Sequence, residues 1–296
     1  MRSTKAALRS IASRRREGDA ALGDTAGWAV MLSRFQLAIV LGVGAFATTA
    51  SSHAQAPINS NVALQPSTGG VIIRQQLRYF EAGEVKAFVV PTTILYGLRD
   101  DLTLLLTTPL VFREVKVPTT GETRRDSGVA DLTFLTKFRV FRDDFGPTDT
   151  RRLSLLGGLE IRSGDSGFTS DSYDPIFGGV FTHAEGRHAF DADLLWKFNT
   201  AGGAARADQM KYDVAYLYRL APDQYTSSKL TALFGVLELN GQYDMNGDHE
   251  LFVSPGISYV TKRWTLEGTI QLPILQELDH RLARDFVVGL SFRIRF

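Results

Sequence analysis

Hydrophobic and polar residues alternate along the last eleven residues of the chain, FVVGLSFRIRF. When every second position is taken, Leu290 and Phe292 fall on one face, whereas Gly289, Ser291 and Arg293 fall on the other. Successive side chains of a β-strand point to opposite faces, so this segment is predicted to be a strand with one apolar and one polar face. The apolar face could pack against the core of a soluble protein or face the lipid of a membrane. This segment alone does not distinguish the two.

Segments with the same alternation recur along the chain, and turn-forming clusters separate them. We expect about twelve strands, at residues 71–81, 84–98, 102–117, 128–141, 151–163, 174–184, 188–200, 209–220, 229–243, 249–262, 264–276 and 284–296. No segment shows a sustained helical period.

The connections between these segments alternate between short and long. LRDD, AEGR and TKR are tight, whereas PTTGETRRDSG, SGDSGFTSDSYD, NTAGGAARAD, GQYDMNGDH and QELDHRLAR are longer and polar. Two connections on the short side, RDDFGPTDTR and APDQYTSS, are of medium length. Short turns at one end and long loops at the other are typical of outer-membrane barrels, in which the short turns are periplasmic.

Formal charges stand in the middle of several polar faces, as Asp191, Asp193 and Lys197 do between apolar neighbours. A packed sandwich would place mainly Ser and Thr there, whereas a water-filled or hydrogen-bonded lumen accommodates charge. An arginine turned toward lipid at the membrane midplane costs about 2–4 kcal/mol, which favours the register that turns Arg293 inward. Eleven strand residues, tilted by about 45°, rise about 25 Å, the height of the apolar band of such a barrel.

We therefore predict an all-β fold, a transmembrane up-and-down antiparallel β-barrel of about twelve strands formed by residues 70–296. Closure of the barrel would remove the sticky sheet edge. Both ends of the barrel segment would be periplasmic.

The composition excludes several classes of protein. Hydrophobic residues make up 44%, charged residues 22%, the formal net charge is +1 and the mean hydropathy is −0.05. A helical membrane protein is excluded because each span needs about 20 consecutive apolar residues. The chain has no cysteine, so it has no disulfide framework, thiolate metal site or cysteine nucleophile. No basic patch or nucleic-acid-binding module is visible, and no cofactor is expected.

One apolar run near the start, FQLAIVLGVGAFATTA at residues 35–50, has the length of the central region of a signal peptide. We expect residues 1–54 to form a leader and signal peptide that is cleaved after Ala54, with translation starting at Met31. An uncleaved anchor helix is the alternative, and a twin-arginine signal would be another use of the arginines at residues 14–16. Residues 55–69 would then form a periplasmic N-terminal segment.

Four stretches carry a family resemblance: DLTFLTKFRVFRDD (131–144), LLGGLEIRSGD (155–165), LFGVLELNGQY (233–243) and LFVSPGISYVTKRWTLEGTIQLPI (251–274). They resemble the outer-membrane β-barrel family labelled as phenol meta-pathway (MetA) degradation proteins, from about residue 70 to the end. The resemblance implies a porin-like pore or transporter for small solutes, aromatic compounds included, in a Gram-negative outer membrane. It supplies no catalytic residues, and we expect no enzyme activity.

The last residue, Phe296, resembles the C-terminal signal by which the barrel-assembly machinery recognises outer-membrane proteins. That machinery, outer-membrane lipid, lipopolysaccharide and a small-molecule solute are therefore the expected partners.

The candidate site is the set of charged side chains predicted to face the lumen: Lys137, Arg139, Glu160, Arg162, Asp191, Asp193, Lys197, Lys211, Asp213, Arg219, Glu238, Glu267, Arg293 and Arg295. These charges could line a conduction path and set its selectivity. Alternatively, they could pair across strands and plug a narrow barrel, which would then act in structure or binding.

Three weaker candidates remain beside the lumen. DMNGDHE brings together Asp244, Asn246, Asp248 and Glu250, which could bind calcium, but Asn-Gly is also a common hairpin turn and we expect no metal site.

An outer-membrane hydrolase could use His249 or His280 with Ser254, and His183 and His188 complete the histidines of the predicted mature chain, but no nucleophile motif is present. The aromatic residues near strand ends are expected in membrane-interface girdles rather than in a solute ladder: Trp196, Phe198, Tyr216, Tyr218, Tyr259 and Trp264.

Overall fold

The computed structural model describes residues 56–119, 121–201, 206–226 and 230–296, and the predicted leader lies outside them. Thirteen strands lie in these residues: β1 (Val71–Ala82), β2 (Val85–Arg99), β3 (Leu102–Lys116), β4 (Thr123–Val129), β5 (Leu132–Asp144), β6 (Thr150–Ile161), β7 (Asp174–Glu185), β8 (His188–Lys197), β9 (Gln209–Ala221), β10 (Ala232–Asp244), β11 (His249–Val260), β12 (Trp264–Glu277) and β13 (Phe286–Arg295). Within the same residues, no helix is long and apolar enough to cross a membrane.

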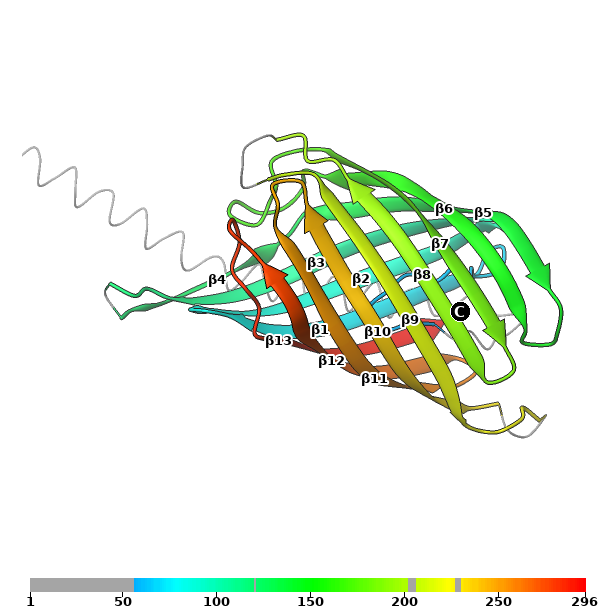
Figure 1. The fold of residues 1–296 in the computed structure, drawn as a ribbon. Helices are drawn as coiled ribbons and strands as arrows, with labels where there is room; N and C mark the ends of the chain where they lie inside the picture. The colour runs from blue at the N-terminus through cyan, green and yellow to red at the C-terminus, as the bar shows by residue number, and fades with distance from the viewer. Residues whose placement is uncertain (1–55, 120, 202–205, 227–229) are drawn as a thin grey trace, which may run out of the picture. The chain divides into compact units, whose positions relative to one another are not determined.

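The strands form one closed antiparallel ring (Figure 1). β1 pairs with β2 on one side and with β13 on the other, so the first and last strands close the barrel. The backbone N–H of Phe296 donates to the carbonyl of Val71 at 2.9 Å at the end of this seam. The predicted antiparallel barrel is confirmed.

β4 and β5 together form a single stave of the barrel. β3 pairs with β5 through Leu102 to Thr107 and with β4 through Leu110 to Lys116, so both short strands lie along the same neighbour. Residues 130–131 interrupt the ladder between them. The barrel therefore has twelve staves, as predicted, although the sequence pattern merged β4 into a loop and the start of β5.

Apolar side chains cover the outer face of the strands and polar side chains fill the inner face. On β13, Leu290 and Phe292 are 53% and 43% exposed, whereas Ser291 and Arg293 are 2% and 8% exposed. Large apolar side chains are exposed in the same way around the whole barrel. A continuous apolar belt of this size is not stable against water, so this face contacts lipid.

The two ends of the barrel differ in their connections. We name the end with residues 100–101, 145–149, 186–187, 222–226, 230–231 and 261–263 the turn rim, and the end with residues 83–84, 117–119, 121–122, 162–173, 198–201, 206–208, 245–248 and 278–285 the loop rim. The predicted long loop at 241–249 is wrong, because β10 continues to Asp244 and β11 starts at His249. Gly247, with a φ of 102°, allows the tight turn between them.

Aromatic side chains gather near both rims on the outer face. At the turn rim the ring of Trp264 lies 5.5 Å from Tyr259 and 6.2 Å from Phe292. Near the loop rim Phe198 lies 5.5 Å from Phe177. Amphipathic and aromatic rings favour the membrane interface, which fits the girdle interpretation better than a solute ladder in the lumen.

The lipid-facing band predicts a depth-dependent response to an added charge. Leu290→Arg, near the middle of β13, is expected to lower the free energy of unfolding by about 2–4 kcal/mol, whereas Ile294→Arg, on the same face near the turn rim, should cost about 0–1 kcal/mol. Urea unfolding of the refolded protein in lipid vesicles measures both values. Equal costs at the two positions would contradict the assignment of the band.

Candidate functional site

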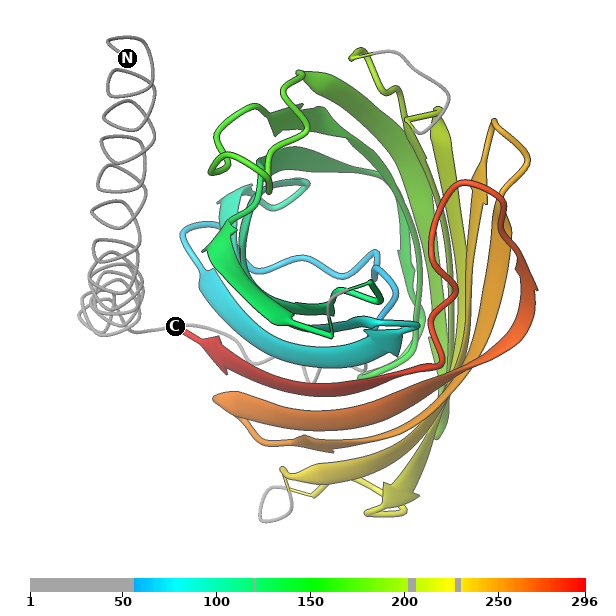
Figure 2. The ribbon, with the colours of Figure 1, turned by 90° about the vertical axis from the view of Figure 1, so that its left-hand side faces the viewer.

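Residues 57–65, named here the inner segment, run inside the ring of strands. Residues 57–60 form hydrogen bonds with interior side chains of β13, β1 and β10. Residue 61 bonds to β8, and residues 62–65 bond to β7, β6 and β5. Figure 2, which looks along the barrel, shows this blue stretch within the ring. Residues 55–69 were expected to form a periplasmic N-terminal segment, and residues 57–65 of it lie in the lumen.

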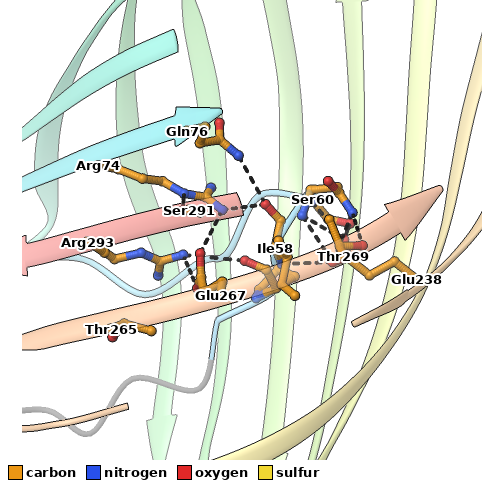
Figure 3. A network of polar contacts seen from close by, with 12 residues as sticks. Ile58, Ser60, Arg74, Gln76, Glu238, Thr265, Glu267, Thr269, Ser291 and Arg293 are labelled. Carbon is orange, nitrogen blue, oxygen red and sulfur yellow. Dashed lines mark hydrogen bonds and ion pairs between the residues drawn. The ribbon is translucent and has the colours of Figure 1, made fainter. Parts of the chain in front are cut away.

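Glu238 on β10 holds the first half of the inner segment through its main chain (Figure 3). Its carboxylate accepts hydrogen bonds from the backbone N–H groups of Ile58, Asn59 and Ser60 at 2.7, 3.0 and 2.9 Å. Within the described residues, every hydrogen bond to this carboxylate comes from residues 58–60. Glu238 is 0% exposed, so without the segment its buried charge would be left uncompensated, at a cost of several kcal/mol.

Asp193 and Asp213 face each other across β8 and β9 on the inner face. Like charges that lie directly opposite destabilise a sheet, so each carboxylate needs its own donor. Asp193 accepts the backbone N–H and the side-chain amide of Asn61 at 2.6 and 3.1 Å, and Asp213 accepts the side-chain amide of Asn240 at 3.0 Å. The inner segment therefore stabilises one member of this acidic pair and the barrel wall stabilises the other.

Lys137 on β5 binds carbonyl groups in the second half of the inner segment. Its ammonium donates to the backbone carbonyls of Val62 and Leu64 at 2.8 and 2.7 Å. The residue is 3% exposed and forms no ion pair with another described residue. Two carbonyl dipoles of the segment therefore offset a buried positive charge that the wall leaves unpaired.

Two arginines bind the start of the inner segment and also pair with the wall (Figure 3). Arg74 donates to the carbonyl of Ile58 and lies 3.1 Å from the Glu267 carboxylate. Arg293 donates to the carbonyl of Pro57 at 3.4 Å and to Glu267 at 2.9 Å. Because both also pair with Glu267, these two arginines would keep a partner if the segment left.

The Ile58 side chain anchors the segment in a small apolar cluster inside the barrel. It is 1% exposed and packs with Leu217 and Phe234, which are 0% and 1% exposed. Gly256 on β11 makes room for it, since a Cβ at Gly256 would lie 2.6 Å from the Ile58 Cδ1 atom. Burial of this side chain contributes about 1.5–3 kcal/mol toward holding the segment.

The chain leaves the lumen at the turn rim, beside Gly97 on β2. The backbone N–H of Gly69 donates to the Gly97 carbonyl at 2.7 Å, and the Thr68 hydroxyl donates to the Asp100 carboxylate at 2.5 Å. A Cβ at Gly97 would lie 2.1 Å from the Ser67 carbonyl oxygen, so only glycine allows this close approach. Residues 67–69 are exposed, and they link the inner segment to β1.

The predicted lumen residues fall into three groups. The buried ones are Lys137, Asp191, Asp193, Arg219, Glu238, Glu267 and Arg293. The partly exposed ones are Arg139, Glu160, Lys197, Asp213 and Arg295. The exposed ones are Arg162, which pairs with Asp171 in a loop-rim connection, and Lys211.

The inner segment brings four of these residues together around one stretch of backbone: Lys137, Asp193, Glu238 and Arg293. Others pair away from it, as Glu160 does with Lys197 at 3.3 Å. Sequence reasoning missed Arg74, although Arg74, Gln76 and Arg78 show the same two-residue spacing of polar side chains. It also missed the segment itself, which has no periodicity to reveal it.

At the loop rim, a cluster of ion pairs ties residues 278–285 to β10 and β11. Arg281 lies 3.3 Å from Asp244 and 2.5 Å from Glu250, and Arg284 also binds Glu250. These carboxylates belong to the stretch considered for calcium. Guanidinium groups therefore pair with two of these carboxylates, Asp244 and Glu250.

Asp248 fixes the same connection through hydrogen bonds. Its carboxylate accepts the backbone N–H of Asp279 at 2.7 Å and both the backbone N–H and the ring of His280 at 3.2 Å. Burial raises the pKa of the Asp248 carboxyl, but the hydrogen bonds from Asp279 and His280 outweigh burial and hold the pKa below its usual range. The carboxylate therefore stays ionised, and the connection stays docked, under mildly acidic conditions.

The residues considered for hydrolysis do not form a nucleophile–base pair. The ring of His249 contacts the Tyr212 hydroxyl at 2.6 Å, and the Ser254 hydroxyl donates to the Asn240 carbonyl oxygen at 2.6 Å on the inner face. His280 binds Asp248 at the loop rim. The other two histidines of the described residues, His183 and His188, lie close to the turn rim, where His188 contacts Tyr216 and Tyr218.

Comparison with solved structures supports the fold. The chain is similar to the COG4313 outer membrane channel from Pseudomonas putida F1, with a TM-score of 0.55, 16% identity and coverage of 81% of this chain and 100% of that chain. It also matches OccK11 (OpdR) from Pseudomonas aeruginosa, with a TM-score of 0.35, 9% identity and coverage of 79% and 98%. Outer membrane phospholipase A from Escherichia coli matches with a TM-score of 0.38, 13% identity and coverage of 81% and 93%.

At this level of identity the first similarity shows an outer-membrane barrel fold and no more, and the other two carry no argument. No family model matches the chain, and no curated protein matches it. The family name implied by the sequence resemblance is therefore not confirmed, whereas the barrel architecture typical of outer-membrane channels is.

Replacing Glu238 tests how the inner segment is held. Glu238→Ala should release residues 58–60, since three backbone N–H groups lose hydrogen bonds to a charged acceptor, each worth about 1.5–3 kcal/mol. Limited proteolysis of the refolded protein, followed by mass spectrometry, should then detect cleavage within residues 57–66. Glu160→Ala is the control, because it removes an interior carboxylate that does not contact the segment. Equal protection in both variants would contradict the role of Glu238.

Asp248→Asn is expected to loosen residues 278–285, because the amide retains a single acceptor oxygen. In the unsubstituted protein the folded-state pKa lies below the unfolded value of about 3.9, so the stabilisation is present above that value and is lost as the pH falls through the lower folded pKa. Hydrogen exchange of this connection, corrected for intrinsic rates, should rise only in the most acidic samples. A rise that begins near pH 6 would be inconsistent with this assignment.

Proposed function

We propose that the chain is an outer-membrane pore for small solutes, and that the inner segment closes its lumen. The observation that carries the proposal is that the segment is held by hydrogen bonds and one apolar anchor and joins the barrel through an exposed linker at the turn rim. Such a segment can leave and return without any strand of the barrel separating. The interior charges would then line the path that the segment vacates.

Water access to part of the lumen supports the pore. Lys211 lies on the same face of β9 as Ala215 and Leu217, which point inward and are both 0% exposed. Lys211 itself is exposed, although it belongs to this inner face. The lumen is therefore hydrated toward the loop rim, and it is filled near the inner segment.

A permanently filled barrel that acts in structure or binding is the second candidate. The burial of Ile58 and the bonds to Glu238 favour it, because both hold the segment in place. The two candidates differ in whether the segment moves.

The solute is part of the proposal. Small aromatic compounds, which the family resemblance implies, stay a prediction. Phe234 and Phe252 are buried rings on the inner face and would offer such compounds an apolar surface. The pairing of Phe296 with Val71 at the seam is compatible with the proposed recognition of the last strand during assembly.

A designed disulfide distinguishes a movable segment from a permanent one. The chain has no cysteine, and the Ser60 hydroxyl lies 3.3 Å from the Asn240 amide nitrogen, so Ser60→Cys with Asn240→Cys gives a unique pair on the segment and the wall. In planar bilayers, the oxidised double variant should be silent, and reduction should restore discrete conductance steps. The two single variants are the controls and should not respond to the reductant.

Silence in both redox states, with insertion verified by heat-modifiable migration, would overturn the pore and leave the filled barrel. Equal conductance in both states would show that the inner segment does not close the lumen.

A further inference from the structure

We propose that the wall around the inner segment is a binding site for peptides, and that residues 57–65 are its resident occupant. The inference rests on the proposed function, because a peptide can reach the site only when the segment has left. It adds a class of ligand for the wall around the inner segment to the small solutes that the pore is proposed to pass.

The wall recognises the main chain of its occupant more than its side chains. Backbone N–H groups of five residues donate to the wall, and these residues are Ile58, Asn59, Ser60, Asn61 and Ala63. Backbone carbonyls of five residues accept from the wall, and these residues are Pro57, Ile58, Val62, Ala63 and Leu64. Any peptide carries these backbone groups, and one that bends as residues 58–60 do presents three consecutive N–H groups to one carboxylate.

Donors and acceptors of the wall are placed on different strands. Carboxylate or hydroxyl oxygens on β7, β8 and β10 accept the N–H groups, whereas side chains on β13, β1, β5 and β6 donate to the carbonyls. Lys137 binds two carbonyls that are two residues apart, Val62 and Leu64, on either side of the bend at Ala63. This arrangement fits a peptide, whose donors and acceptors emerge along one chain.

Three buried charges in the wall depend on a bound peptide. Glu238, Asp193 and Lys137 are 0%, 6% and 3% exposed, and within the described residues they take their hydrogen bonds from the inner segment alone. An apolar solute would bury these charges without partners, whereas a peptide would replace each lost bond. The wall is therefore built to hold amide groups.

Side-chain burial narrows the class of peptide. Ser60 and Ala63 are 5% and 0% exposed, so only small side chains fit at these two positions. The side chain of Ile58 packs in an apolar cluster, so that position favours an aliphatic residue. Asn59, Asn61, Val62 and Leu64 are partly exposed and leave more room. The expected ligands are short peptides with an aliphatic residue followed by small residues at the second and fifth positions after it.

The test uses the full chain with a site for a sequence-specific protease inserted between Ser67 and Thr68, in the exposed linker. Cleavage, checked by mass spectrometry, frees the inner segment, and washing the bilayer should open the pore. A synthetic peptide of residues 57–65 should then close it again. A second peptide, with alanine in place of Asn59, Asn61, Val62 and Leu64, should close it at a concentration within about fivefold of the first, because the hydrogen bonds to buried charges run mainly through the backbone.

The matched control is the first peptide with N-methyl groups on the amides of Asn59, Ser60 and Asn61. It keeps every side chain but loses three donors, so it should need at least about tenfold more peptide to close the pore. The inference would be overturned if the N-methylated peptide closed the pore at the same concentration as the unmodified peptide. It would also be overturned if the peptide with the native sequence closed the pore and the alanine-substituted peptide did not. A pore that opens and ignores all three peptides would also overturn it while leaving the proposed function intact.

A cleaved and washed protein that never conducts would instead refute the proposed function, and with it this inference. In the uncleaved protein the tethered segment should hold the site, so added peptides should have little effect. In the cleaved protein, Glu238→Gln should raise the concentration of peptide needed for closure several-fold, because the acceptor of three N–H groups loses its charge. An unchanged requirement would count against recognition by the carboxylate.

Discussion

The structure depends on the constraint that an ionised group inside a closed barrel must find a partner within the barrel. Lipid surrounds the outer face, so the charges on the strands can only turn inward, where a lumen of twelve staves leaves limited room for water. Glu267 meets this constraint through Arg74 and Arg293, all three on the wall. Glu238 and Lys137 meet it through a stretch of chain that belongs to no strand. The inner segment is therefore an electrostatic complement of the wall as much as a steric obstruction.

Much of the barrel could be predicted because the alternation that specifies each strand is local in the sequence. Alternation along β13 assigns Leu290 to lipid and Arg293 to the lumen from sequence alone, since lipid penalises any other register. The twelve staves followed from counting such segments. β4 escaped detection because its sequence, TRRDSGV, alternates poorly and lies beyond the apolar band, and the turn at 245–248 is shorter than its polar composition indicates.

The candidate site was predictable only in part, because its contacts are not local. The inward direction of Glu238 and Asp193 follows from alternation, but their partners lie 178–180 and 132 residues away along the chain. The inner segment, PINSNVALQ, has neither a period of two nor a charge, and most of its bonds to the wall use backbone atoms that every sequence possesses. Nothing in its residue types could indicate that it lies inside the barrel.

The position of the inner segment at the start of the described chain has a consequence for biogenesis. Its first residues contact β10, β12 and β13 at sequence separations of 180, 210 and 236 residues, so its site forms only once these distant strands are in place. Contacts of such large sequence separation form late, after the entropy of closing the intervening chain has been lost. Closure of the barrel and docking of the inner segment are thus separable steps of folding.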